Sequence, residues 1–228
     1  MAGAFITFEG IDGCGKSTQL RLLASELRVR GLEVVATREP GGTTLGQRLR
    51  GALLDVEEQV DPLAELLVFA ADRAQHVRAL LVPALEANHV VLSDRYADAT
   101  VAYQGAGRGF KPALIAEIVQ LATDGLTPDL TLLFDLSVAE SAMRTRRRVA
   151  SKNSDRLDSE DAEFHTRVRN AYLAIAKAEP ARFCIIDARG SVQQTHEAVM
   201  NIVMPFLQQR GLIDEEEMAK RKAPSAEQ

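Results

Sequence analysis

A short glycine-rich stretch near the N-terminus has the residue types and the spacing needed to bind phosphate groups. Residues 10–17 read Gly-Ile-Asp-Gly-Cys-Gly-Lys-Ser and match the pattern G-x-x-x-x-G-K-[ST] at every fixed position. Glycines allow the backbone to curl until successive N–H groups point at one small volume, where Lys16 adds a positive charge. The Ser17 hydroxyl is placed to ligate Mg²⁺. We therefore predict that this stretch, called the phosphate loop below, binds a nucleoside triphosphate through Gly10, Ile11, Asp12, Gly13, Cys14, Gly15, Lys16, Ser17 and the adjoining Thr18.

The segments on either side of the phosphate loop supply the context that the motif needs. Residues 5–9 are rich in β-branched and aromatic side chains, as in a buried strand. In residues 18–27 the apolar side chains recur three and four positions apart, which is typical of one face of a helix. The N-terminus of that helix would add its partial positive charge to the phosphate site. Because strand, loop and helix follow in this order, a chance turn with the same letters is the weaker interpretation.

Size and composition are ordinary for a globular protein. The chain has 228 residues, of which 46% are hydrophobic and 26% are charged, values typical of one soluble α/β domain. No apolar run approaches the roughly 20 residues of a membrane span, and too few residues precede the first strand for a signal peptide. We therefore expect no membrane partner and a cytoplasmic location. The net charge of −5 argues against a long nucleic acid as the ligand.

The cysteines and histidines do not have the spacing of a metal site. Cys14 and Cys184 form neither a disulfide framework nor a metal-binding pair. We interpret Cys14 as a small residue of the phosphate loop. The 4 histidines are scattered along the chain, and we interpret them as surface or packing residues and not as zinc ligands.

Charged residues follow two further predicted strands at the point where each strand ends. Residues 33–37 read as a strand that delivers Arg38. Residues 89–94 read as a strand that ends in Asp94 and is followed by Arg95. Ligands of open α/β sheets bind at the carboxyl ends of the strands, and an acid there commonly orients Mg²⁺. These side chains are therefore expected beside the phosphate loop, although for Arg38 a plain polar connection is an equally good interpretation.

Residues 61–87 are predicted to be mostly helical, with Asp61 as the N-cap and Pro62 in the first turn. Phe69 and Arg73 lie one turn apart on one face, which suits a base pocket where a ring stacks and a guanidinium donates. The pattern alone favours the alternative, in which Phe69 lies in the core and Arg73 is solvated. The core stripe of this helix is expected at Leu63, Leu66, Leu67, Ala70, Ala74, Val77 and Leu81.

The second half of the chain continues the alternation of strands and helices in a single domain. The expected elements are a Gly-rich turn over 103–109, helices over 112–123, 162–177 and 192–209, and strands over 130–135 and 183–187. The domain is expected to span residues 1–210. Residues 211–228 have little apolar content and are predicted to form a flexible tail.

An arginine-rich segment interrupts one of the helices in this half. Arg144, Arg146, Arg147 and Arg148 stand close together, and polar, loop-forming residues follow them. Like charges at this density repel one another unless an anion or carboxylates neutralise them. A solvated basic face is the plain interpretation. We favour a mobile lid over residues 144–157 that stabilises charge on a phosphoryl group in transfer.

Four motifs together point to a known family. They are residues 8–18 around the phosphate loop, Arg-Glu-Pro-Gly-Gly-Thr at 38–43, Asp-Arg-Tyr at 94–96 and Ala-Tyr-Gln-Gly at 102–105. With these motifs the chain, from about residue 5 to 209, resembles the bacterial thymidylate kinases (dTMP kinases) of the P-loop nucleoside-monophosphate kinase group. The resemblance implies a P-loop NTPase fold, an α/β three-layer sandwich in which helices flank about five parallel strands. It also implies a homodimer that phosphorylates dTMP to dTDP with ATP and Mg²⁺.

The resemblance assigns roles around the sugar and phosphate of dTMP. Asp12 would bind the 3′-hydroxyl group of the sugar and help to hold the acceptor in place. Arg38 and Arg95 would grip the phosphate. Tyr103 would crowd the 2′ position and so disfavour ribonucleotides.

The resemblance also implies a pocket for the base. Phe69 would stack on thymine, Arg73 and Thr100 would hydrogen-bond its edge, and Gln104 would lie nearby. The base-pocket interpretation of Phe69 and Arg73 thereby becomes the favoured one.

One departure from the family pattern bears on the catalytic arginine. Some members carry an arginine in the phosphate loop directly after the acid, where this chain has Gly13. The chain therefore resembles the type that supplies this arginine from the lid, and Arg146 or Arg148 is expected in that role. The predicted catalytic set is completed by Lys16, Arg95 and Asp12. Mg²⁺ is assigned to Ser17 and Asp94, and further nucleotide contacts to Arg144 and Arg189.

Two other functions stay open at this point. A kinase for another monophosphate, or for a deoxynucleoside, could share the same fold. A nucleotide-gated switch such as a small GTPase is the more remote alternative. Residues 187–190 do spell D-x-x-G, but they follow the last strand, and the sequence contains no Asn-Lys-x-Asp motif for reading guanine.

Overall fold

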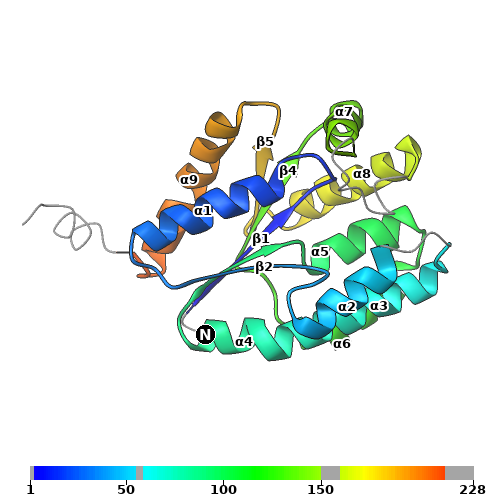
Figure 1. The fold of residues 1–228 in the computed structure, drawn as a ribbon, viewed down its shortest axis with the longest axis horizontal. Coiled ribbons are helices and arrows are strands. Elements are labelled where there is room, and N and C mark those ends of the chain that lie inside the picture. Colours follow the sequence, from blue (N-terminus) through cyan, green and yellow to red (C-terminus); the bar gives the residue numbers. More distant parts are fainter. Residues whose placement is uncertain (1–2, 55–58, 150–159, 214–228) are drawn as a thin grey trace, which may run out of the picture.

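Five parallel strands form the sheet that carries the phosphate loop. The computed structural model describes residues 3–54, 59–149 and 160–213. Within these residues the strand order is β2-β3-β1-β4-β5, so that β1 is central and the phosphate loop starts from the middle of the sheet (Figure 1). The predicted five-stranded parallel sheet is confirmed. Its strands are β1 (Ala4–Glu9), β2 (Val34–Arg38), β3 (Val90–Asp94), β4 (Leu130–Asp135) and β5 (Phe183–Asp187).

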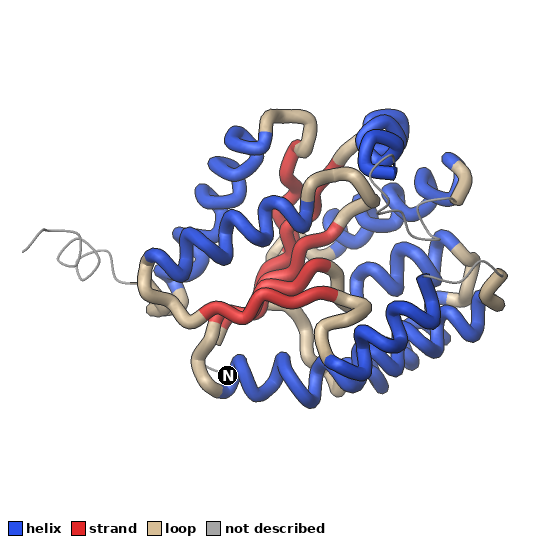
Figure 2. Tube along the Cα trace, in the orientation of Figure 1, coloured by secondary structure: helices blue, strands red, loops and turns tan. Residues whose placement is uncertain are grey.

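Helices cover both faces of this sheet and complete the expected three-layer sandwich (Figure 2). One face is packed by α1 (Lys16–Val29) and α9 (Val192–Gln209), whose apolar stripes meet Ile6 and Phe8 of β1. The opposite face buries Phe5 and Leu133 beneath the other helices. Those elements are α2 (Thr44–Leu54), α3 (Pro62–His76), η1 (Val77–Leu81), α4 (Val82–Glu86), α5 (Ala97–Thr100), η2 (Val101–Gly107), α6 (Pro112–Thr123), α7 (Val138–Val149) and α8 (Ala162–Ala178).

The register of the strands brings the predicted polar residues to one edge. Asp94, the last residue of β3, is paired with Phe8 of β1 on one side and with Arg38 of β2 on the other. Parallel strands run in the same direction, so their carboxyl ends stand side by side. Arg38, Asp94 and the start of the phosphate loop therefore share the edge that the sequence predicted for ligand binding.

Helix α3 starts as predicted, and Leu66, Val77 and Leu81 of the predicted core stripe are buried. The Asp61 carboxylate accepts from the Leu63 backbone N–H at 2.8 Å and caps the helix. Leu63 and Leu67, predicted for the core, are 46% and 53% exposed, so that part of the prediction is wrong. Polar residues take further buried positions, where other elements supply hydrogen-bond partners; they are Glu65, Asp72, Arg73 and His76.

The glycine-rich segment predicted as a turn over residues 103–109 is helical up to Gly107, and only residues 108–109 form a turn. Its backbone forms η2, a π-helical continuation of α5 that ends at Gly107. A Cβ atom at Gly107 would lie 2.6 Å from the Phe164 ring of α8, so glycine is needed for the close approach of η2 and α8. The sequence signal for a turn thus reflects tight helix packing.

The structure describes only part of the predicted lid and only part of the predicted C-terminal tail. Helix α7 contains residues 144–149 of the predicted lid, whereas residues 150–157 and the side chains of Arg147 and Arg148 lie outside the described residues. Of the predicted tail, residues 211–213 are described, and Ile213 packs into the core beside α9. In the described part of the chain, no helix has the length and apolar character to span a membrane.

Candidate active site

The phosphate loop curls between β1 and α1 around its own lysine. Gly13 and Gly15 have φ angles of +78° and +95°, values that glycine adopts without strain. The Lys16 ammonium donates to the carbonyl oxygens of Gly10 (2.9 Å) and Ile11 (3.0 Å), so its charge lies inside the loop. Cys14 is buried against it, and burial raises the pKa of the Cys14 thiol. These contacts hold the loop in the shape in which its N–H groups can cradle phosphates.

Helix α7 is packed directly on the phosphate loop. The Ser141 hydroxyl donates to the Asp12 carbonyl oxygen. A Cβ atom at Gly13 would lie 2.9 Å from both the Ser141 carbonyl oxygen and the Thr145 hydroxyl oxygen. The space for a side chain at Gly13 is therefore filled by α7, which gives a physical reason for glycine at this position. The same packing brings Arg144 to the loop, while Arg146 is exposed.

Two oxygen groups suited to a divalent cation meet beside the loop. The Ser17 hydroxyl donates to the Asp94 carboxylate at the end of β3. Hydroxyl and carboxylate oxygens are the ligands that Mg²⁺ prefers, and it takes few protein ligands when phosphates and water supply the others. The described residues contain no cluster of three or more His, Cys, Asp or Glu that could hold a metal. This pair fits Mg²⁺ that arrives with a nucleotide, and its role as a metal site stays a prediction.

Arg95 connects the phosphate loop to η2 and α8. Its guanidinium donates to the Asp12 carboxylate (2.7 Å), the Tyr103 hydroxyl (2.9 Å) and the Gly10 carbonyl (3.1 Å). The Tyr103 hydroxyl in turn donates to Asp12 at 3.0 Å, and the Arg95 guanidinium lies 4.7 Å from the Tyr103 ring centre. Burial opposes ionisation of Asp12, but Arg95 and Lys16 outweigh it and hold the Asp12 pKa well below its usual range. Asp12 is therefore a carboxylate at neutral pH.

Two residues that were not predicted for the site, Tyr172 and Glu9, form a chain of hydrogen bonds with Arg95. Its guanidinium also donates to the Tyr172 hydroxyl of α8 (3.3 Å), which donates to the Glu9 carboxylate (2.7 Å). The other Glu9 oxygen accepts from the Tyr96 backbone N–H at 2.7 Å. Arg95 has a φ angle of +73°, a conformation that costs energy in an arginine and that these bonds help to maintain. Burial and the nearby Asp98 charge raise the Glu9 pKa to about 8.

Arg73 is buried and hydrogen-bonded, not solvated as the alternative interpretation of α3 held. It is 2% exposed, and its three nitrogens donate to the Glu39 carboxylate (2.8 Å), the Thr100 hydroxyl (2.7 Å) and the Tyr96 carbonyl (2.9 Å). Glu39 also contacts His76 at 2.8 Å. These contacts of Glu39 with Arg73 and His76 were not predicted, because the partners lie more than 30 positions away in the sequence.

The other predicted acceptor-site residues lie near these groups or at the edge of the sheet. Phe69 is half-buried one turn before Arg73 and packs against the cluster that contains Tyr103. Gln104 is buried one turn after Thr100 and donates to the Glu65 carboxylate at 2.9 Å. Arg38 is exposed at the end of β2.

Arg189 lies in an exposed loop after β5. It forms an ion pair with Asp187, the last residue of β5, at 2.6 Å, and no hydrogen bond among the described residues joins it to the phosphate loop. Arg189 would therefore have to leave Asp187 or use its remaining donors to contact a nucleotide.

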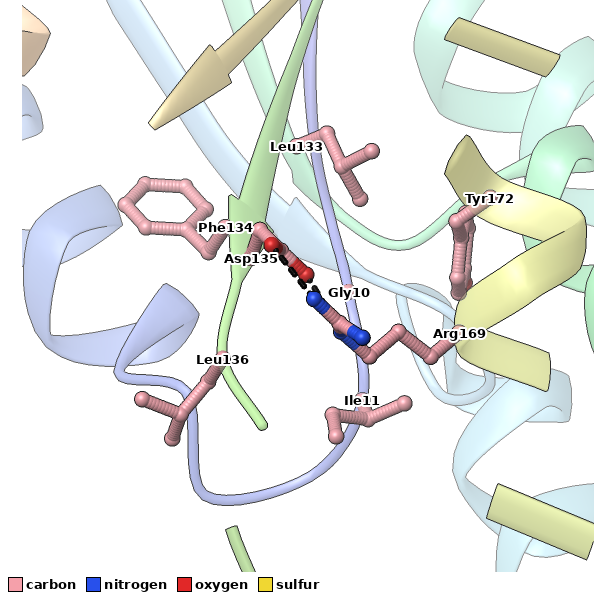
Figure 3. A pocket seen from close by; sticks show the side chains of 8 residues that line it. All are labelled: Gly10, Ile11, Leu133, Phe134, Asp135, Leu136, Arg169 and Tyr172. Carbon is pink, nitrogen blue, oxygen red and sulfur yellow. Dashed lines mark hydrogen bonds and ion pairs between the residues drawn. The ribbon is translucent and has the colours of Figure 1, made fainter. Parts of the chain in front are cut away.

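A small pocket of about 180 Å³ lies behind the phosphate loop and is closed by an ion pair (Figure 3). The Arg169 guanidinium of α8 reaches the Asp135 carboxylate at the end of β4 with bonds of 2.7 and 2.8 Å. That volume includes open solvent, and the enclosed space leaves no room for a ligand, so this pocket is not a nucleotide site. The ion pair instead anchors α8, which carries Tyr172, to the sheet. The pocket is lined by Gly10, Ile11, Leu133, Phe134, Asp135, Leu136, Arg169 and Tyr172.

The buried Asp72 carboxyl group should make the free energy of unfolding depend on pH. One of its carboxylate oxygens accepts from the Gly41 backbone N–H at 3.1 Å, and the other is buried without a partner among the described residues. Burial, followed by the charge of Glu39, raises the Asp72 pKa from 3.8 to about 6. The folded state therefore holds this proton more tightly than the unfolded chain, and the resulting stability is lost as pH rises from about 4 to 6. The shift corresponds to roughly 3 kcal/mol.

The check is a comparison of wild type with Asp72→Asn by urea unfolding between pH 4 and 7.5. The asparagine side chain of the variant cannot ionise, so the variant's free energy of unfolding should gain on the wild-type value by about 3 kcal/mol across this range. A difference that stays constant with pH would show that the Asp72 pKa is the same in the folded and unfolded states.

Comparisons with known proteins agree with this geometry. The family model described as thymidylate kinase matches residues 8–199. The thymidylate kinase of Geotalea uraniireducens is 48% identical over 209 residues, which cover 90% of this chain and 98% of that protein. That of Clavibacter sepedonicus is 52% identical over 188 residues, 82% of this chain and 88% of that protein. The crystal structure of thymidylate kinase from Ehrlichia chaffeensis matches with a TM-score of 0.73 at 36% identity, covering 89% of this chain and 98% of that one. The chain therefore belongs to the thymidylate kinase family.

Proposed function

We propose that the cleft beside the phosphate loop transfers the γ-phosphoryl group of Mg²⁺-bound ATP to dTMP. The chain belongs to a family of enzymes that phosphorylate dTMP to dTDP with a nucleotide donor. The observation that carries the proposal is the position of Arg95, which hydrogen-bonds both Asp12 of the phosphate loop and Tyr103 of η2. A cation thus stands between the loop for the donor and the helices for the acceptor, where two phosphates would meet.

The reaction requires mainly that the charges of the two nucleotides are neutralised and that their phosphates are aligned. A phosphate oxygen of dTMP is already anionic, so it attacks the γ-phosphorus without a strong general base. The new P–O bond forms as the bond between the γ-phosphorus and its bridging oxygen breaks, and ADP leaves. Lys16 and Arg95 carry the positive charge that opposes the repulsion of the two nucleotides. Mg²⁺, when held by Ser17 and Asp94 with the phosphates, would neutralise further charge.

The lid arginines are proposed to complete this charge balance. Arg144 lies beside the phosphate loop on α7, and Arg146 follows on the exposed side of the same helix. We assign the catalytic role to Arg146 or Arg148, and a nucleotide contact to Arg144 and Arg189. The lid over residues 144–157, the kinase domain over 1–210 and a tail over 211–228 are the proposed organisation of the chain.

The acceptor is proposed to lie between α3 and η2. Arg38 and Arg95 would hold its phosphate, and Asp12 its 3′-hydroxyl group. Tyr103 donates to Asp12 and so stands beside the same sugar position, where it would exclude a 2′-hydroxyl group. The base would lie against Phe69, with Arg73, Thr100 and Gln104 along its edge.

The proposed function is tested with a panel of acceptors. Purified protein is mixed with Mg²⁺-ATP and, separately, dTMP, dUMP, dCMP, dGMP and thymidine, and the nucleotide products are measured by chromatography. We expect dTDP and ADP in equal amounts with dTMP. Preferred phosphorylation of another monophosphate or of thymidine would favour the rival kinases. GTP hydrolysis without transfer to any acceptor would favour the switch protein.

Phe69 is expected to contribute to acceptor binding and not to donor binding. Replacing Phe69 with alanine should raise the KM for dTMP by about tenfold or more, because base–aromatic stacking is worth roughly 1–3 kcal/mol. The KM for ATP should change little. Steady-state kinetics with each substrate varied in turn provides the measurement, and Phe206→Ala, on α9, is a control for loss of a half-buried ring. Equal increases in both KM values would assign Phe69 to the core.

The homodimer is proposed from exposed apolar side chains on two neighbouring helices. Leu63 and Leu67 lie one turn apart on α3, and Leu114 and Leu121 lie on α6, which packs beside α3. Exposed apolar patches of this kind mark protein interfaces. The double substitution Leu67→Glu and Leu121→Glu should halve the mass measured by light scattering. Val29→Glu, which is equally exposed on α1, should leave the mass unchanged. A wild-type monomer would contradict this part of the proposal.

A further inference from the structure

A buried carboxylate next to the proposed base pocket controls one of the pocket's polar side chains. Glu65 of α3 is fully buried, and one of its oxygens accepts from the Gln104 side-chain amide nitrogen at 2.9 Å. The Arg108 guanidinium donates to both oxygens of Glu65, at 3.2 and 2.9 Å. Arg108 is in turn held by Glu160 at 2.7 Å and lies 4.8 Å from the Phe164 ring centre. Glu65 is therefore a fixed acceptor at both oxygens.

This contact determines the orientation of the Gln104 side-chain amide. An ionised carboxylate can only accept hydrogen bonds, so it must face the NH₂ group of Gln104 and not its carbonyl oxygen. The carbonyl oxygen of Gln104 is left as the free acceptor, and no hydrogen bond from another described residue reaches it. Turning the amide over would place two acceptors against each other in a buried site, at a cost of several kcal/mol.

The Gln104 carbonyl oxygen lies on the same side of the proposed base pocket as the N–H donors of Arg73. Glu65, Phe69 and Arg73 follow one another at single-turn spacing on α3. Thr100 and Gln104 are one turn apart on the facing segment formed by α5 and η2. The hydrogen bonds from Gln104 to Glu65 and from Arg73 to Thr100 link these two stripes on either side of Phe69. A ring stacked on Phe69 would therefore meet an acceptor from Gln104 and donors from Arg73.

We propose that Glu65 is a positioning residue that makes the pocket select thymine over cytosine by holding the Gln104 carbonyl oxygen toward the base. The inference rests on the proposed function of this cleft and adds the basis for choosing the pyrimidine. Thymine offers a donor at N3–H and an acceptor at O4, which match Gln104 and Arg73. Cytosine offers an acceptor at N3 and a donor at its amino group, which oppose both. Uracil has the same edge as thymine and is not distinguished by this contact.

The proposal is tested with Glu65→Gln. The new amide can donate to the Gln104 carbonyl oxygen, so the Gln104 amide is free to turn and present its NH₂ group to the base. The ratio of kcat/KM for dTMP to that for dCMP should fall about tenfold or more, since an unmatched buried polar group accounts for most of such discrimination. The ratio for dTMP to dUMP should stay within about twofold. A general loss of packing would lower all three activities together and leave the first ratio unchanged.

The exchanged pair Glu65→Gln with Gln104→Glu provides the second variant. It returns a carboxylate to the Arg108 cluster and places an acceptor-only group toward the base, so the preference for dTMP over dCMP should be restored. Glu86→Gln, an exposed change on α4, is the control. If the single variant does not fold, the exchanged pair decides the question alone.

The outcomes separate this inference from the proposed function. An unchanged dTMP to dCMP ratio in Glu65→Gln, or its loss in the exchanged pair, overturns the inference while the kinase activity stands. A wild-type protein that does not phosphorylate dTMP in the same assay overturns the proposed function and the inference with it.

Discussion

Replacing Lys16 with methionine should lower kcat by about a thousandfold or more. The Lys16 ammonium lies inside the phosphate loop, 2.9 and 3.0 Å from the carbonyl oxygens of Gly10 and Ile11. It is buried, so its charge acts on bound phosphates with little screening by water. Removal of one preorganised donor from a developing negative charge typically costs a factor of roughly 10²–10³, and a full charge costs more. Methionine keeps the length and apolar stem of the side chain and removes only the charge.

The measurement is the rate of dTDP formation at saturating ATP and dTMP, together with ATP binding by calorimetry. Lys177→Met, which removes an exposed lysine from α8, should retain the wild-type rate. Thermal unfolding of both variants shows whether the loop still folds without the Lys16 contacts. A kcat within about tenfold of wild type would remove Lys16 from the transition state.

Replacing Arg95 with alanine should lower kcat/KM for dTMP by about three orders of magnitude or more. The Arg95 guanidinium is the link between Asp12, Tyr103 and Tyr172, and its side chain is only 16% exposed. Its loss removes a cation from the meeting point of the two phosphates and leaves the half-buried Asp12 carboxylate without its closest positive partner. Both effects act in the same direction, because an unbalanced negative charge at Asp12 repels an incoming phosphate.

Arg95→Lys separates charge from geometry. Lysine keeps the positive charge but lacks the planar fork that contacts Asp12 and Tyr103 together, so its activity should lie between those of wild type and Arg95→Ala. Arg30→Ala, which breaks an exposed ion pair with Glu26 on α1, is the control for loss of an arginine. Wild-type kinetics in Arg95→Ala would contradict the role assigned to this side chain.

The parts of the site that could be predicted from the sequence are those that a few consecutive residues define. The phosphate loop was found because its glycines, lysine and serine act through spacing within eight positions. The end of β3 was found because a buried strand that stops at an acid and an arginine is visible in the sequence. The contact of Ser17 with Asp94 then followed from the parallel pairing of β1 with β3. The family resemblance added the roles of Phe69, Arg73, Thr100 and Gln104, which remain predictions.

The predictions that were wrong concern residues whose burial depends on side chains from another element. Leu63 and Leu67 have the period of a core stripe but are exposed. Besides Leu66 of that stripe, α3 buries polar side chains because Glu39, Thr100 and Arg108 meet them with complementary charges and hydrogen bonds. Helical period identifies an apolar stripe and does not say which stripe faces the protein. The glycines of η2 indicated a turn because the local signal for a bend and for close helix packing is the same residue.

The sequence by itself determined that this protein is an α/β nucleotide-binding enzyme of the thymidylate kinase family, because strand, loop and helix signals are local and the motifs are short. The tertiary structure alone decided which side chains support the site. The hydrogen bond between Tyr172 and Glu9 joins residues 163 positions apart, and that between Gln104 and Glu65 joins residues 39 apart. The physical reason is that a buried polar group takes its role from the partner that satisfies it. Folding, and not the neighbouring sequence, brings that partner into place.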